Sequence, residues 1–146
     1  MVGDDFPEQH LDFLRSRVVD LEGLKKSAGR TFRWKGRYGY DLNEAHTLET
    51  HLNVFEGFDP VLTDEQRASP YVFLANIDPE LQLEVLQQVR RPKLVACDTM
   101  NFWIDGKREA LLKTLRHVDT LVINEGEARQ LAGEPNLIKA SRAILA

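Results

Sequence analysis

The stretch KLVACDTMNFWIDGKREALLKTLRHVDTLVINEGEARQLAG, residues 93–133, decides the expected fold. It contains two short apolar runs, Lys93–Cys97 and Thr120–Ile123, whose length and composition are typical of buried strands. Between them, Leu111, Leu115 and Val118 recur at the spacing of one helix face, which predicts a helix over Lys107–His117. The stretch therefore predicts a strand–helix–strand unit with parallel strands.

Polar residues follow both strands of this unit. Asp98 and Asn101 follow the first strand, and Asn124 and Glu127 follow the second. Parallel strands joined by crossover helices end at the same edge of a sheet, where open α/β sheets bind their ligands. We therefore expect these four side chains to converge on one crevice.

Asn124 and Glu127 also fit a purely structural role. Asn124 directly precedes an expected short helix that ends near Leu131, and Glu127 comes three residues later, as in a capping box. A phosphate or a metal ion would suit the same helix start. The spacing alone leaves both interpretations open.

The same strand–helix rhythm extends on both sides of this stretch. Tyr71–Ala75 is expected as a strand and Glu80–Arg90 as a helix, and a last helix is expected from Asn136. A loop rich in Pro, Asp and Ser is expected over residues 57–70. Alternating strands and helices predict a parallel sheet covered by helices.

Before residue 57 the pattern differs. A helix is expected from Pro7, with Leu11, Leu14 and Val18 on one face. A short strand is expected within Val18–Leu24.

Residues 31–40 then alternate, so that Phe32, Trp34, Tyr38 and Tyr40 share one face. A second alternating run places His46, Leu48, Thr50, Leu52 and Val54 on one side, and Asp41–Glu44 is the expected turn. This predicts a β-hairpin with an aromatic face that covers the core, covers a ligand or meets a second subunit.

The opposite face of the first hairpin strand carries Arg33, Lys35 and Arg37. Such a basic row suits a phosphate, but a solvated surface explains it more simply. His46 and His51 are five residues apart in one strand, so regular alternation predicts opposite faces and no shared metal ion.

Composition limits the function classes. The chain has 146 residues, of which 42% are hydrophobic, and this suffices for one substantial core. The formal net charge of -4 argues against general nucleic-acid binding. The lone cysteine, Cys97, ends an apolar strand and is expected to be a buried, inert thiol. No apolar run approaches the length of a membrane span, so we expect a cytoplasmic protein without membrane or nucleic-acid partners.

Several segments together resemble the carbohydrate kinases of ribokinase type, the PfkB family. They are the Asn-x-x-Glu of VDTLVINEGEARQLAG with its following NLIKASRAI helix, and the aspartate and asparagine of DTMNFW, which are similar to the family's Asp-x-Asn strand end. The opening VGDDFP is similar to the family's Gly-x-Asp segment, and the aromatic hairpin occupies the place of the lid. The resemblance covers nearly all of the chain in the family's order.

This resemblance implies a three-layer, ribokinase-like (Rossmann-like) α/β fold. Its lid strands would span about residues 30–56, and its α/β core would span residues 1–29 and 70–146. The implied reaction is transfer of the ATP γ-phosphoryl group to a carbohydrate hydroxyl with the help of Mg²⁺.

The resemblance also implies roles for individual residues. Asn124 and Glu127 would organise the Mg²⁺ ion and its waters near the ATP phosphates, which suits a hard cation that keeps several waters. Asp98 and Asn101 would lie beside the same crevice, on the substrate side. The lid residues Arg33, Trp34 and Tyr38 would exclude water or contact the sugar.

The chain also departs from the family pattern. No Gly-Gly sugar-binding segment precedes the opening, and no Gly-Ala-Gly-Asp segment, which supplies the family's catalytic base, follows Asn124. Trp103 stands where related acid-sugar kinases have arginine, which makes a carboxylate-bearing substrate less expected. We therefore expect residues 1–146 to be a partial domain, a central fragment without kinase activity of its own.

Two other hypotheses stay open. One is a non-enzymatic interaction module that forms a homodimer through the aromatic hairpin. The other is an unrelated Rossmann-like domain in which Asn124 and Glu127 form only a helix cap.

Overall fold

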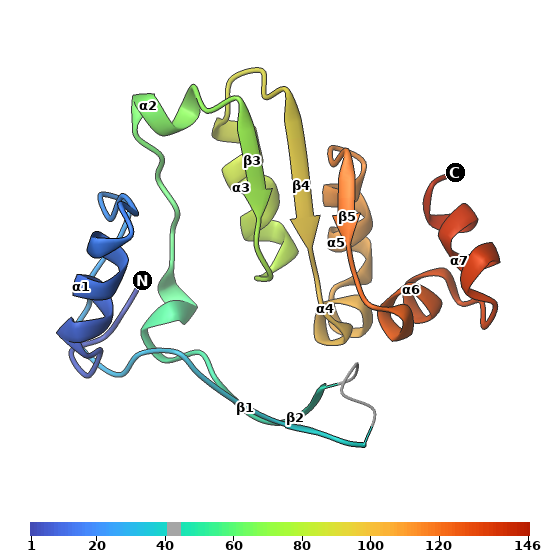
Figure 1. The fold of residues 1–146 in the computed structure, drawn as a ribbon, viewed down its shortest axis with the longest axis horizontal. Helices are drawn as coiled ribbons and strands as arrows, with labels where there is room; N and C mark the ends of the chain where they lie inside the picture. The colour runs from blue at the N-terminus through green and yellow to red at the C-terminus, as the bar shows by residue number, and fades with distance from the viewer. Residues whose placement is uncertain (41–44) are drawn as a thin grey trace. The chain divides into compact units, whose positions relative to one another are not determined.

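The computed structural model describes residues 1–40 and 45–146. The chain divides into two compact units, Met1–Val61 (unit 1) and Leu62–Ala146 (unit 2). Figure 1 shows the helices and strands of each unit with the labels used below. None of the helices in the described residues combines the length and the apolar character that crossing a bilayer requires.

The first helix of unit 1 is α1, Glu8–Ser16. It begins one residue later than expected, because Pro7 is its N-cap residue and not its first residue. Leu11 on this helix is fully buried, as predicted. Val18 lies beyond the helix end, is 93% exposed and has a φ of 59°, so its predicted place on the buried face is wrong. The strand expected within Val18–Leu24 is also wrong, because the chain forms turns there.

The opening segment of unit 1 is tied to residues 29–31 by backbone and carboxylate hydrogen bonds. The Gly3 N–H donates to Thr31 Oγ1 (2.9 Å), the Gly29 N–H to Asp4 Oδ2 (2.9 Å), and the Thr31 N–H to Asp5 Oδ1 (2.7 Å). The two backbones approach so closely that a Cβ on Gly3 would lie 2.2 Å from the Gly29 carbonyl oxygen. Only glycine fits at this position without a shift of the backbone.

The predicted hairpin is confirmed. Strands β1, Arg33–Tyr38, and β2, Ala45–His51, pair antiparallel, and the 3₁₀ helix η1, Asn53–Gly57, follows. The turn expected at Asp41–Glu44 lies outside the described residues. Trp34 folds over Gly36, where an added Cβ would lie 2.1 Å from the indole ring, and its Nε1–H donates to Thr47 Oγ1 (3.1 Å).

A β-bulge interrupts the second strand, and it corrects the expected faces. Lys35 pairs with Glu49 but Gly36 pairs with Thr47, so Leu48 is the extra residue. Paired residues of antiparallel strands point to the same side of the sheet. His46, which pairs with Arg37, and His51, which pairs with Arg33, therefore share one face, and the prediction of opposite faces is wrong.

Unit 2 contains a three-stranded parallel sheet in the order β3-β4-β5. The strands are β3, Tyr71–Leu74, β4, Leu94–Asp98, and β5, Thr120–Val122, within one residue of their predicted ends. The helices are α2, Asp64–Arg67, α3, Pro79–Gln88, α4, Asn101–Gly106, α5, Arg108–Leu115, α6, Glu125–Ala132, and α7, Leu137–Ile144. The short helices α2 and α4 were not predicted.

One face of this sheet forms the core of unit 2. Leu74, Val95 and Cys97 are buried there against residues of α3 and α5, which lie on the same side of the strands (Figure 1). The other face carries Tyr71, Phe73, Leu94 and Val122, which are 42–65% exposed. The predicted parallel α/β sheet is confirmed with helices on one face of the described unit, whereas the finer three-layer, ribokinase-like arrangement stays a prediction.

A second buried cluster joins the helices that follow β4 and β5. Ile104 of α4, Leu111 of α5 and Leu131 of α6 pack together, and Ile144 of α7 lies against them. Because α4 and α6 begin directly after strand ends, this cluster fixes the loops at the carboxyl edge of the sheet.

Candidate functional site

Three of the predicted polar residues lie at the carboxyl ends of two neighbouring strands. Asp98 is the last residue of β4 and pairs with Val122 of β5. Asn124 lies two residues after Val122 and caps α6, whose first turn contains Glu127. We call Asp98, Asn124 and Glu127 the edge site.

Asn124 and Glu127 form a complete capping box. The Glu127 N–H donates to Asn124 Oδ1 (2.9 Å), and the Asn124 N–H donates to Glu127 Oε2 (3.0 Å). The structural role that the spacing allowed is therefore confirmed. The cap uses only Oε2 of the carboxylate, so Oε1 is free of hydrogen bonds to the described residues and can face a ligand.

The two carboxylates of the edge site lie within electrostatic reach of one another. Burial raises the pKa of Glu127, the Asn124 N–H lowers it, and the negative charge of Asp98 raises it further. Burial also raises the pKa of Asp98, although backbone N–H groups, including that of Asn76, partly offset this. No Lys, Arg or His of the described residues offsets the charge of either carboxylate. A bound cation would therefore lower the energetic cost of burying these two charges and of their mutual repulsion.

Asp98 also has an oxygen that lacks a partner. Its Oδ1 is buried and makes no hydrogen bond within the described part of the chain, and the same holds for Thr99 Oγ1 and Gln82 Oε1. Buried acceptors are normally satisfied, so such oxygens mark positions where water or a ligand is expected.

The side chain of Gln82, on α3, bonds to the carboxyl ends of β3 and β4. It is 2% exposed, and its Nε2 donates to the carbonyl oxygens of Leu74, Ala75 and Asp98 (3.2, 3.0 and 3.1 Å). This single amide therefore ties the end of β3 to the end of β4. Nothing in the sequence singled out Gln82, because one polar residue on a helix has no motif around it.

Asn76 and Trp103 form a second polar link at this edge. The Trp103 Nε1–H donates to Asn76 Oδ1 (3.0 Å), and the Asn76 backbone N–H lowers the pKa of the Asp98 carboxyl. The Phe102 ring packs edge-on against the indole at 4.8 Å. Sequence reasoning missed Asn76 as a site residue, although a polar residue two positions after a strand was an available signal.

Asn101 does not join the edge site by any contact that the structure records. It is exposed at the first position of α4, and its Oδ1 accepts the N–H of Phe102 (2.9 Å). Its predicted place near the crevice agrees with its position after β4, while its predicted contact with substrate stays a prediction.

The donor set of the edge site suits magnesium better than zinc. The described residues contain no group of three or more His, Cys, Asp or Glu side chains placed to hold a metal ion. Mg²⁺ does not need such a cage, because it usually binds one or two carboxylates and fills its other positions with waters and phosphate oxygens. Asp98 and Glu127 offer two carboxylates of this kind.

Cys97 is fully buried next to Asp98. Burial, with the charge of Asp98, raises the pKa of its thiol to about 11. A protonated, buried thiol is a poor nucleophile, so the predicted inert role is supported.

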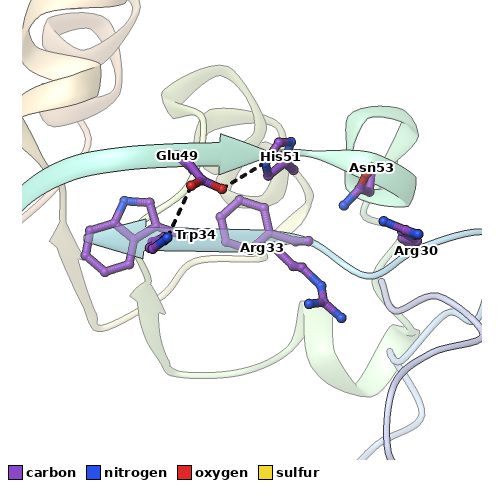
Figure 2. A pocket seen from close by; sticks show the side chains of 8 residues that line it. Arg30, Arg33, Trp34, Glu49, His51 and Asn53 are labelled. Carbon is purple, nitrogen blue, oxygen red and sulfur yellow. Dashed lines mark hydrogen bonds and ion pairs between the residues drawn. The ribbon is translucent and has the colours of Figure 1, made fainter. Parts of the chain in front are cut away.

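The predicted lid residues lie in unit 1, on the hairpin. Arg33, Trp34 and Tyr38 are all exposed, and Arg33 forms an ion pair with Asp5 (3.3 Å). Arg33 and Trp34 line an open pocket of about 540 Å³ (Figure 2). Tyr38 is not among the residues that line it.

Comparison with known proteins leaves the family open: no protein-family model matches this chain, and no curated protein matches it.

Proposed function

We propose that unit 2 provides the Mg²⁺- and ATP-phosphate-binding part of an ATP-dependent carbohydrate kinase of the PfkB type. The observation that carries this proposal is that two partly buried carboxylates, Asp98 and Glu127, lie near enough to repel one another at the carboxyl edge of a parallel sheet, with no compensating Lys, Arg or His among the described residues. The order of sequence segments described above supports the choice of carbohydrate as the phosphoryl acceptor.

In this proposal, Glu127 and Asp98 would hold Mg²⁺ directly or through its waters, which gives Asp98 a metal role in place of the substrate-side role that the resemblance implied. Asn124 keeps the Glu127 carboxylate in place through the capping box and would bind the same waters. The bound ion would neutralise charge on the transferred phosphoryl group, which is the main task of a protein in this chemistry. The first N–H groups of α6 lack intrahelical partners and favour a phosphate nearby.

Within unit 2, the acceptor side of the proposal uses Asn101, which would contact the sugar. The Gly-Ala-Gly-Asp segment that supplies the base in this family does not occur in residues 1–146. We therefore expect this chain alone to bind MgATP without phosphorylating a sugar.

The test compares ATP binding by the native chain and by Glu127→Gln, with and without Mg²⁺. Glutamine still accepts the Asn124 N–H, so the cap and the fold stay intact. With Mg²⁺, we expect isothermal titration calorimetry to show ATP binding weakened about tenfold, because a ligand of the ion is lost. Without Mg²⁺, the same variant should bind ATP no more weakly than the native chain, because a negative charge has been removed.

Glu125→Gln is the matched control. Glu125 lies in the same first turn of α6 but is exposed and pairs with Arg129 (3.0 Å). Its substitution removes the same charge from the same helix end and should change MgATP binding by less than about twofold. If both variants weakened MgATP binding equally, the effect would come from the general charge at the helix end, and Glu127 would have no specific role in binding magnesium.

The interaction module remains the second candidate, because one observation favours it. The aromatic hairpin face is open to solvent: Trp34 is 38%, Tyr38 54% and Tyr40 106% exposed. A homodimer through these residues would bury them. Sedimentation equilibrium of the native chain and of Tyr38→Ser separates the candidates, since only the module requires a dimer that the substitution weakens.

A further inference from the structure

The bulge in β2 creates a face of unusual charge on the hairpin. Three cross-strand pairs occupy this face, in the order Arg33–His51, Lys35–Glu49 and Arg37–His46. Without the extra residue Leu48, His46 would point to the other side. The bulge therefore gathers three basic residues and two histidines around one carboxylate.

The pocket of about 540 Å³ lies at one end of this face. Its size is within the range of small-molecule sites in proteins. Figure 2 shows Arg30, Arg33, His51 and Asn53 around it. Glu49 pairs with both His51 and Lys35. All of its lining residues lie between positions 30 and 53, within unit 1.

Cations exceed anions among the described residues of the lining. Of these residues, Glu49 is the one carboxylate, and Lys35 (3.3 Å) and His51 (3.5 Å) share it. Asp5, outside the lining, pairs with Arg33 at 3.3 Å. These exposed pairs are long, and such pairs contribute only about 0–1 kcal/mol, so a competing anion can replace them.

Of these cations, Arg30 has the fewest side-chain interactions with the described residues. Its side chain forms no ion pair or hydrogen bond with any residue in the described ranges, while its backbone oxygen accepts the Val54 N–H (3.1 Å). A guanidinium presents paired donors that match two phosphate oxygens. Arg30 and Lys35 therefore offer a phosphate one bidentate contact and one point charge.

We propose that this pocket binds the phosphate group of a phosphorylated small molecule. The pocket recognises the dianionic phosphate group of the ligand. Arg30, Arg33 and Lys35 contact this group, and His51 is a further hydrogen-bond donor. The proposal does not rest on the proposed kinase function, because the site lies within unit 1 and its test contains neither Mg²⁺ nor ATP, although Arg33 and Trp34 are also residues that the family resemblance assigns to the lid.

The test is a titration of the ¹⁵N-labelled chain, followed by NMR at constant ionic strength, with pyrophosphate, glucose 6-phosphate and glucose. We expect saturable shifts at residues 30–35 and 49–53 with both phosphorylated compounds and none with glucose. In Arg30→Gln/Lys35→Gln, binding should weaken about tenfold or more, because charge-assisted hydrogen bonds are lost. These side chains are exposed, and an unchanged far-UV circular dichroism spectrum verifies the fold.

Arg37→Gln is the matched control, since Arg37 shares the basic face but does not line the pocket. Its binding should stay within about twofold of native, because only the general field changes. Binding of pyrophosphate but not of glucose 6-phosphate would assign the site to free polyphosphate. Equal weakening in the control and the double variant, or the absence of saturation, would overturn the proposal and leave a solvated basic surface.

Discussion

Replacing Leu111 by alanine is expected to lower the free energy of unfolding of unit 2 by about 3 kcal/mol, the usual cost of a large cavity in a core. Leu111 is 0% exposed and packs between Ile104 and Leu131. Its removal leaves a void between Ile104 of α4 and Leu131 of α6, the helices that follow β4 and β5, so the edge site should loosen as well. Urea unfolding followed by far-UV circular dichroism gives the change in free energy.

Leu112→Ala is the control for this prediction. Leu112 is the next residue of the same helix but is 40% exposed, so its truncation opens no enclosed cavity. We expect a loss below about 1 kcal/mol, since alanine also favours the helix. Similar losses for the two variants would mean that Leu111 does not occupy a closed core.

Replacing Gly3 by alanine should destabilise unit 1 by about 2 kcal/mol, in the range of overpacked sites. The new Cβ would lie 2.2 Å from the Gly29 carbonyl oxygen and 2.6 Å from the Thr31 nitrogen, and backbone atoms cannot turn aside as a flexible side chain does. Hydrogen exchange measured by mass spectrometry should show faster exchange at residues 2–5 and 29–31, while the unit 2 peptides stay unchanged.

Gly39→Ala provides the comparison, because a Cβ there meets nothing within 4 Å. The Gly39 variant should keep native exchange at residues 2–5 and 29–31. Native exchange there in the Gly3 variant too would show that the opening segment does not pack against residues 29–31.

Much of unit 2 could be predicted from the sequence, because parallel strands obey a simple rule. The apolar runs before Asp98 and Asn124 fixed β4 and β5, and adjacent parallel strands then had to bring their following residues to one edge. The capping box could be read from the Asn124–Glu127 spacing alone. Helix α4, by contrast, has only six residues, too few for a periodic pattern to show.

The predictions that failed did so because the sequence pattern does not record irregular backbone geometry or contacts between distant segments. A period of two cannot reveal a bulge, so the side on which His46 lies was lost after one extra residue, Leu48. Val18 is apolar and follows a helix stripe, but a left-handed turn removes it from the helix. The contacts of Gln82 and Asn76 depend on tertiary geometry, since their partners come from other segments of the chain.

The central claim, that Asp98 and Glu127 share a divalent cation, is tested most directly by adding Mn²⁺ in place of Mg²⁺ to the ¹⁵N-labelled native chain. Paramagnetic Mn²⁺ broadens the NMR signals of nearby amides. At low Mn²⁺ concentration, we expect the broadening to be confined to Asn76, residues 98–101 and residues 124–127, and we expect Glu127→Gln to remove it. Broadening at other acidic surfaces, such as Glu8 and Asp12 on α1, with sharp signals at the edge site, would contradict the claim.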